Sequence, residues 1–104
     1  MLIREKDKKE IIALANKTLK TPLKIWAYGS RVNGEAHDAS DLDLVIISKD
    51  KKPIDINEFL NFKEHLTNSN IPILIQVMDW HRMPNSFHKN ILSNYEELVE
   101  IVKV

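Results

Sequence analysis

The sequence predicts an α/β (α+β) fold in one domain, residues 1–104, with helices packed on a small sheet. Three observations predict this class. Apolar residues recur at helical spacing near the N-terminus, two strand-sized apolar runs follow, and a second helical pattern separates these runs from a third. The resulting order is helix, strand, strand, helix, strand, helix.

The first elements are bounded by proline and glycine. Helical periodicity predicts an amphipathic helix over residues 5–20, which ends at Pro22. Residues 23–28 are expected to form a buried strand, which stops at Gly29. Residues 30–34 then resemble one helical turn, and a polar loop follows.

The middle of the chain contains the clearest strand, residues 41–47, which is rich in β-branched residues and alternates at its start. Pro53 argues against its continuation. Asp55 and Glu58 have the spacing of a capping box, so they predict the start of a helix that ends near Asn68.

The C-terminal third predicts a strand over residues 71–78 and a short helix over residues 84–92, with Ser86 as its cap. Residues 96–104 fit either a strand or a helix.

Composition excludes several classes of function. Fifteen basic and fifteen acidic residues balance, whereas domains that bind nucleic acid through its backbone are usually basic. The chain has no cysteine, which excludes disulfides, thiolate metal sites and cysteine nucleophiles. The charged N-terminus is unlike a signal peptide, and no apolar run reaches membrane length. We therefore expect a cytoplasmic protein that binds neither membrane nor nucleic acid.

One motif carries chemistry. Gly29-Ser30 is followed, after ten residues, by Asp41-Leu42-Asp43. A glycine between a strand and a helical turn lets the backbone approach a phosphate, and the turn's free N–H groups favour an anion. Two residues apart on a strand, Asp41 and Asp43 point to the same side, where a magnesium ion would relieve their repulsion. An isolated Asp-x-Asp would more simply be two solvated aspartates.

Other candidates carry less weight. Trp26 and Trp80 are expected in the core or an interface, and Tyr28 is expected to be a packed strand residue. The four histidines show no metal-ligand spacing and are expected to be exposed. They are His37, His65, His81 and His88.

The stretch AYGSRVNGEAHDASDLDLVII resembles the signature of the minimal nucleotidyltransferases (MNT) of the DNA polymerase β superfamily. Arg31, Gly34 and Ser40 also stand where that family usually has them. The resemblance implies a palm-like mixed sheet. It further implies that Gly29, Ser30, Arg31 and Ser40 bind the nucleotide, and that Asp41 and Asp43 bind metal. Family members use two metal ions to bind the triphosphate and transfer AMP.

The chain departs from the family at one position. The family's third carboxylate corresponds to Gln76 in this sequence. A glutamine oxygen can ligate magnesium, but it adds no charge and accepts no proton, and a positioned general base is typically worth about 10²–10⁴ in rate. Asp79 is not an obvious replacement, because three residues along a strand place it on the opposite face.

The resemblance implies an ATP- and magnesium-dependent protein adenylyltransferase. Minimal members commonly act as antitoxins that transfer AMP to a tyrosine of a helical HEPN-type toxin, in a hetero-oligomer. The alternative is a catalytically weakened antitoxin that neutralises its partner by binding alone, which Gln76 favours. An aminoglycoside-type transferase would need a substrate domain, for which we expect no room, or a homodimer that builds the cleft between its subunits.

Overall fold

The computed structural model describes residues 3–34 and 41–102 of the protein. Their helices and strands follow the predicted order, and the C-terminal segment forms a further strand. The elements are α1 (Glu5–Thr18), β1 (Leu23–Tyr28), α2 (Ser30–Asn33), β2 (Leu42–Ser48), α3 (Ile56–Thr67), β3 (Ile75–Asp79), the 3-10 helix η1 (Trp80–Arg82), α4 (Asn85–Ser93) and β4 (Tyr95–Ile101).

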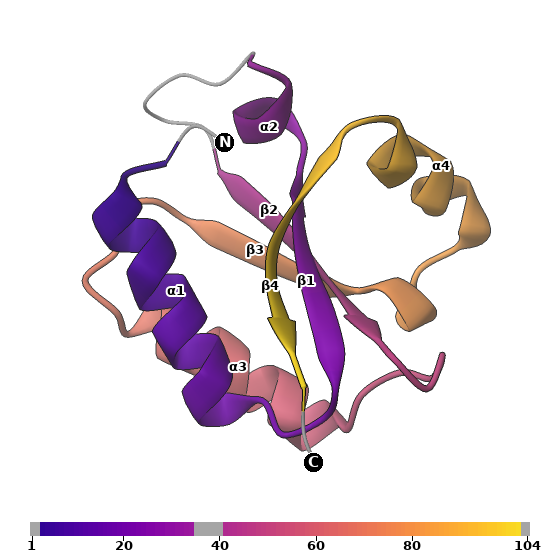
Figure 1. Ribbon diagram of the computed structural model, residues 1–104, viewed down its shortest axis with the longest axis horizontal. Helices are drawn as coiled ribbons and strands as arrows, with labels where there is room; N and C mark the ends of the chain where they lie inside the picture. Colours follow the sequence, from indigo (N-terminus) through magenta and orange to yellow (C-terminus); the bar gives the residue numbers. More distant parts are fainter. Residues whose placement is uncertain (1–2, 35–40, 103–104) are drawn as a thin grey trace.

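The strands of the described residues form one sheet in the order β3-β2-β1-β4 (Figure 1). β1 is antiparallel to both of its neighbours, β2 and β4, whereas β2 and β3 run parallel. A parallel pair needs a crossover connection, and α3 lies between β2 and β3 in the chain. The predicted mixed sheet with helices packed on it is confirmed.

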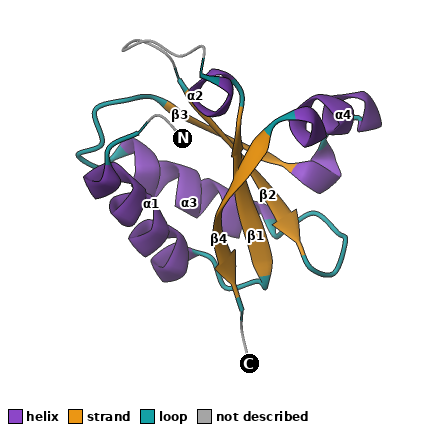
Figure 2. Ribbon diagram, turned by 45° about the horizontal axis from the view of Figure 1, so that its top comes forward, coloured by secondary structure: helices purple, strands orange, loops and turns teal. Residues whose placement is uncertain are grey.

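The two faces of the sheet differ. α1 and α3 lie side by side over one face (Figures 1 and 2), and alternate residues of β1 from Leu23 to Ala27 are buried against them. The intervening residues Lys24, Trp26 and Tyr28 point to the other side, which we call the open face. The main apolar core therefore lies on the helical side, and the open face carries these polar and aromatic residues beside Val45, which pairs with Trp26 and is fully buried.

η1 and α4 cover part of the open face through aromatic contacts. The Trp80 ring meets Trp26 edge-on, with 5.8 Å between centroids, and His88 of α4 stacks on Trp80 at 3.6 Å. Trp26 also stacks on Tyr95 of β4 at 4.1 Å. These rings link residues from β1, η1, α4 and β4. Trp26 and Trp80 are partly buried and lie outside the apolar core, so their expected place in a core is wrong and their place in an interface stays a prediction.

The third strand is shorter than predicted. β3 begins at Ile75, whereas the apolar run predicted a start at residue 71. β2 begins at Leu42, whose N–H donates to the Leu74 carbonyl at 2.9 Å and whose register partner is Ile75. No residue of β2 precedes Leu42 to pair with residues 71–74, and Pro72 has no N–H to donate. Residues 71–74 therefore do not join the sheet.

The structure confirms one half of the predicted capping box and contradicts the other. The Asp55 carboxylate accepts from the Asn57 and Glu58 N–H groups and starts α3 as expected. The Glu58 carboxylate, however, accepts from the Lys20 and Thr21 N–H groups and from the Thr21 hydroxyl. Glu58 therefore ties α3 to the connection between α1 and β1, and this contact fixes the helical layer to the sheet.

Two C-terminal expectations are settled differently. Residues 95–101 are strand β4, paired with β1, which resolves the open choice between strand and helix. The prediction that Ser86 caps α4 is wrong, because the cap position belongs to Pro84 and no side chain makes a capping bond there.

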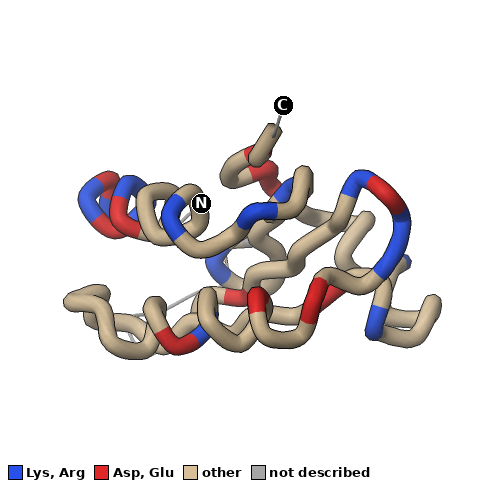
Figure 3. The backbone as a smooth tube through the Cα atoms, turned by 90° about the horizontal axis from the view of Figure 1, so that it is seen from below, with Lys and Arg blue, Asp and Glu red and all other residues tan. Residues whose placement is uncertain are grey.

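In Figure 3 basic and acidic residues are interspersed along the backbone tube.

Candidate active site

The Asp-x-Asp motif leads into β2, beside the end of β1 and the start of β3. Register pairing aligns one residue from each strand of the sheet into a row across the open face, at the level of Asp43. The row consists of Gln76 (β3), Asp43 (β2), Tyr28 (β1) and Tyr95 (β4). Gln76, which the resemblance puts in the place of a third carboxylate, is therefore the register partner of Asp43.

Gly29 brings the backbone against Asp43. Its φ of 83° and ψ of −157° lie in a region that is essentially reserved for glycine. A Cβ atom on Gly29 would lie 2.6 Å from Asp43 Oδ2. The Gly29 carbonyl accepts from the Val32 N–H at 3.0 Å and so opens the α2 turn. Glycine is thus required twice, by backbone conformation and by proximity to the carboxylate.

Gln76 contacts the carboxylate that precedes β2. Its Nε2 donates to Asp41 Oδ2 at 2.8 Å, and Gln76 itself is exposed. The amide thus bridges from β3 to the first aspartate of the motif, while register places its backbone beside the second. This arrangement brings Asp41, Asp43 and Gln76 together at one end of the open face.

Burial and repulsion perturb the charge of the motif. Burial, and then the neighbouring Asp41 carboxylate, raise the pKa of Asp43 above its ordinary value. Burial, and then the Asp43 carboxylate, raise the pKa of the Tyr28 hydroxyl in the same way. Burial is the larger cause of both shifts, and the smaller cause in each is a neighbouring carboxylate, whose repulsion an added cation would relieve.

Asp79 serves the fold and not the site. Its side chain is fully buried, and its oxygens accept from the Ile54 N–H at 3.0 Å and the His81 N–H at 2.9 Å. The Arg82 guanidinium lies 3.5 Å away. These contacts agree with the expectation that Asp79 lies on the face opposite Gln76 and is not an obvious replacement for a third carboxylate.

The nucleotide-binding candidates are placed unevenly. Ser30 is the first residue of α2, directly after Gly29, and is partly exposed. Arg31 is 7% exposed and already takes part in an interaction within the protein. Ser40 lies outside the described residues. The expected roles of all three in holding a triphosphate stay predictions.

The histidine expectation is wrong for the three histidines in the described residues, since each is partly buried. His88 stacks on Trp80, and its Nε2 lies 2.8 Å from the Trp80 carbonyl oxygen. His81 has a buried Nε2 with no hydrogen-bond partner among these residues. His65 Nδ1 lies 2.9 Å from the Asn61 carbonyl. His37 lies outside the described residues.

Sequence reasoning missed Tyr95 as a member of the row. Tyr95 is 42% exposed and pairs with Tyr28 across β1 and β4. No local signal marks it, because its place beside the site depends on the pairing of strands that are far apart in the chain.

The model of the family described as polymerase beta, nucleotidyltransferase, matches residues 9–103. The chain belongs to this nucleotidyltransferase family. Its Gly-Ser and Asp-x-Asp motif occupies one end of the open face, and the sheet has the expected mixed topology. The resemblance inferred from the sequence is thereby confirmed at the level of family and fold.

A curated relative from Haemophilus influenzae is named "Probable protein adenylyltransferase MntA". This nucleotidyltransferase is 37% identical to it over 76 residues, which are 73% of this chain and 65% of the relative. The chain thus spans slightly less than two thirds of the relative that it matches.

Two solved structures share the fold. A crystal structure of a toxin–antitoxin with AMP-PNP has a TM-score of 0.73 at 17% identity, covering 89% of this chain and 73% of the other. A tri-AMPylated Shewanella oneidensis HEPN toxin in complex with an MNT antitoxin gives 0.68 at 13% identity, covering 93% and 72%. At these identities the likeness concerns the fold alone.

The side chains at the motif fit a divalent cation with oxygen ligands. Asp41 and Asp43 supply carboxylates. The Gln76 amide can present its oxygen to a cation if its hydrogen bond to Asp41 breaks. Among the described residues no group of three or more His, Cys, Asp or Glu side chains could hold a metal ion. The nucleotidyltransferase therefore offers two carboxylates and a neutral amide at this point.

None of the helices in residues 3–34 and 41–102 combines the length and the apolar character that crossing a bilayer requires.

Proposed function

We propose that this protein is an ATP- and Mg²⁺-dependent adenylyltransferase that transfers AMP to a tyrosine of a helical HEPN-type partner and acts as its antitoxin. The observation that carries the proposal is the contact between Gly29 and Asp43, beside the Asp41–Gln76 pair. It joins a backbone suited to a phosphate to a carboxylate pair suited to a cation. The name of the Haemophilus influenzae relative and the toxin–antitoxin structures support the same class of partner.

Each residue has a role in this proposal. The Gly29 backbone and the Ser30 and Arg31 donors hold the triphosphate, and Asp41 and Asp43 hold the cation. The bound Mg²⁺ supplies charge for the phosphates and lowers the pKa of the attacking hydroxyl. A bond forms between the acceptor oxygen and the α-phosphorus, the bond from that phosphorus to the bridging oxygen breaks, and pyrophosphate leaves. The proton of the acceptor hydroxyl passes to solvent or to a carboxylate.

The second candidate is an antitoxin that neutralises its partner by binding alone. The Gln76 amide favours it, because it donates to Asp41 and provides no third carboxylate to accept a proton. Nucleotide binding would survive in such a protein while transfer would be slow or absent. In either form we expect the protein to act in the cytoplasm.

Intact-mass analysis distinguishes the two candidates. The product of an adjacent reading frame for a small helical protein with an Arg-x4-His motif is incubated with this protein, ATP and Mg²⁺. We expect additions of one or more AMP groups, and no addition with the Asp41→Ala variant. An unmodified partner that nevertheless co-purifies with the wild-type protein would favour binding alone. A partner that neither binds nor changes mass would contradict both.

A further inference from the structure

The Asp43 carboxylate has a different neighbour on each side. On the β1 side its register partner is Tyr28, and a Cβ atom on the next residue, Gly29, would lie 2.6 Å from Asp43 Oδ2. On the β3 side its register partner is Gln76. The turn proposed for the triphosphate therefore borders Asp43 on one side, and a neutral amide borders it on the other.

The Gln76 amide directs the positive end of an N–H dipole at Asp41. Its Nε2 donates to Asp41 Oδ2 at 2.8 Å. A cation bound to the same carboxylate on the β3 side would meet this N–H group and be repelled by it. If the amide turned to present its oxygen, Asp41 would lose the hydrogen bond and the cation would gain a ligand without charge. The β3 side of the motif is therefore poorly suited to a cation.

No third carboxylate compensates among the residues that the structure describes, where no three His, Cys, Asp or Glu side chains form a metal-binding group. Asp79, at the end of β3, is fully buried and already accepts from the Ile54 and His81 N–H groups. The protein charge available to cations at the motif is thus that of Asp41 and Asp43.

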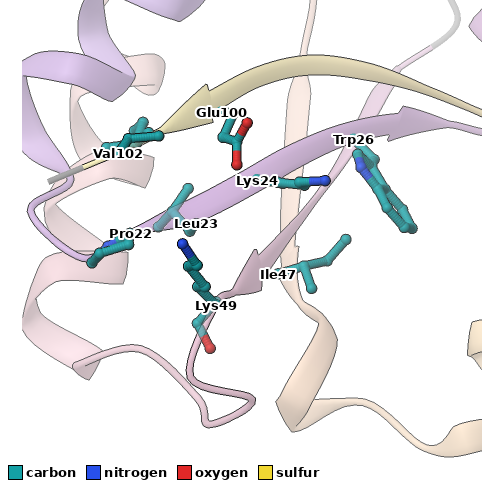
Figure 4. Close-up of a pocket in the computed structure, with 10 residues that line it drawn as sticks. Pro22, Leu23, Lys24, Trp26, Ile47, Lys49, Glu100 and Val102 are labelled. Carbon is teal, nitrogen blue, oxygen red and sulfur yellow. The ribbon is translucent and has the colours of Figure 1, made fainter.

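A pocket of about 480 Å³ at the opposite end of the sheet from Gly29 supplies no further ligand (Figure 4). Its lining comes from the start of β1, the ends of β2 and β4, and the residues that flank them, and it includes Glu100. Along β2 the fully buried Val45 separates Ile47, in this lining, from Asp43. Four residues at about 3.3 Å each put Ile47 about 13 Å from Asp43, too far for a shared cation.

We infer that the site holds one divalent cation, between the two aspartates and the triphosphate, and that the Gln76 N–H occupies the place beside Asp41 that a second cation would need. This inference rests on the proposed function. Paired metal ions lie about 3.5–4 Å apart and repel each other strongly, so a pair depends on the negative charge of its shared ligands. The one cation then serves both the triphosphate and the acceptor hydroxyl.

The number of cations is measured with Mn²⁺, which takes the same oxygen ligands as Mg²⁺. The protein is dialysed to equilibrium against Mn²⁺ and a non-hydrolysable ATP analogue. Metal analysis and nucleotide absorbance then give the ratio of bound Mn²⁺ to bound analogue. The Asp43→Asn variant corrects for Mn²⁺ bound elsewhere on the protein. We expect a ratio of one for the wild-type protein.

Gln76→Glu is the sharpest variant, because it replaces only the amide NH₂ by a carboxylate oxygen, at the atom that lies 2.8 Å from Asp41 Oδ2. Two carboxylates at that distance repel each other unless a cation joins them. The ratio should therefore rise to two, with the second Mn²⁺ bound at least about tenfold more tightly than by the wild type.

Met78→Glu is the matched control. Met78 is two residues further along β3, on the same face as Gln76, and is 44% exposed. This variant adds the same charge to the same strand, but its register partner is Val45 and not Asp43. Its ratio should stay at one.

The outcomes separate this inference from the proposed function. Two Mn²⁺ per analogue in the wild-type protein would overturn the inference and leave the proposed function standing. A ratio that stays at one in Gln76→Glu, or that rises to two in Met78→Glu, would overturn the role assigned to the Gln76 N–H. If the wild-type protein binds no analogue, or binds it without Mn²⁺, the inference and the proposed function both fail.

Discussion

Replacement of Gly29 by alanine tests the geometry of the site most severely. The new Cβ would lie 2.6 Å from Asp43 Oδ2, and the φ of 83° with ψ of −157° is strained for any residue with a side chain. Such backbone strain costs about 1–3 kcal/mol. Because 1 kcal/mol shifts the melting temperature of a domain of this size by about 4–8 °C, we expect a decrease of at least several degrees.

Gly34→Ala is a matched control. Gly34 also has a positive φ, 85°, so alanine there is strained by about 1–2 kcal/mol as well. No described atom, however, lies within 4 Å of the point that the new Cβ would occupy. Both variants should therefore lose stability, but only Gly29→Ala should displace the Asp43 carboxylate.

The assay is thermal denaturation, followed by circular dichroism, with and without Mg²⁺ and a non-hydrolysable ATP analogue. The wild-type protein and Gly34→Ala should gain stability from the ligand, and Gly29→Ala should gain little or none. A Gly29→Ala variant that is stabilised by the ligand as much as the wild type would refute the proposed approach of phosphate and carboxylate at Gly29.

Three further predictions concern side chains. Gln76→Asp, which restores a third carboxylate beside Asp43, should raise the transfer rate at least tenfold and up to about 10²–10⁴, measured as AMP added to the partner per minute. Asp43→Asn should raise the melting temperature of the metal-free protein at pH 7. In the wild type, the raised pKa of the Asp43 carboxyl means that the folded state binds its proton more tightly than the unfolded state does. The metal-free wild type therefore loses stability as the pH rises from the ordinary pKa of 3.8 through the raised pKa, and asparagine removes this loss. Glu58→Ala should destabilise the protein by about 1–3 kcal/mol in urea denaturation, because it leaves the Lys20 and Thr21 donors without their acceptor, while transfer per folded molecule is unchanged.

The first two of these predictions have a clear contrary result, and the third has a matched control. An unchanged rate in Gln76→Asp would mean that proton acceptance at this position does not limit transfer. If the melting temperature of Asp43→Asn had the same pH dependence as that of the wild type, the raised pKa of Asp43 would be contradicted. Glu64→Ala, on the exposed side of the same helix, is the control for Glu58 and should have almost no effect on stability.

Much of the fold follows from local signals. β1 and β2 begin and end within one residue of their predicted limits. Both are apolar, β-branched runs of strand length, and Gly29 and a polar loop mark where each must end. The start of β3 was not predictable in the same way, because it depends on where β2 begins to offer partners. Ile71 and Ile73 look like strand residues in the sequence, but they pack against the core from outside the sheet.

The part of the site that depends on local signals was also predictable. Gly29, Asp41 and Asp43 lie close in the sequence, so their grouping follows from one turn and one strand. The Gln76–Asp41 hydrogen bond and the contact of Tyr95 with Trp26 join residues that are 35 or more positions apart. The pocket at the far end of the open face likewise gathers residues from three strands, which only the pairing of β1, β2 and β4 brings together.

The central claim is that Asp41 and Asp43 make one end of the open face a site for a metal-bound nucleotide. Isothermal titration calorimetry with a non-hydrolysable ATP analogue, in Mg²⁺ and again in EDTA, tests it most directly. We predict binding by the wild-type protein in Mg²⁺ that weakens at least tenfold in EDTA, and at least tenfold in the Asp43→Asn variant. Binding that is equally tight in all three conditions, or that is absent from the wild-type protein, would contradict the account.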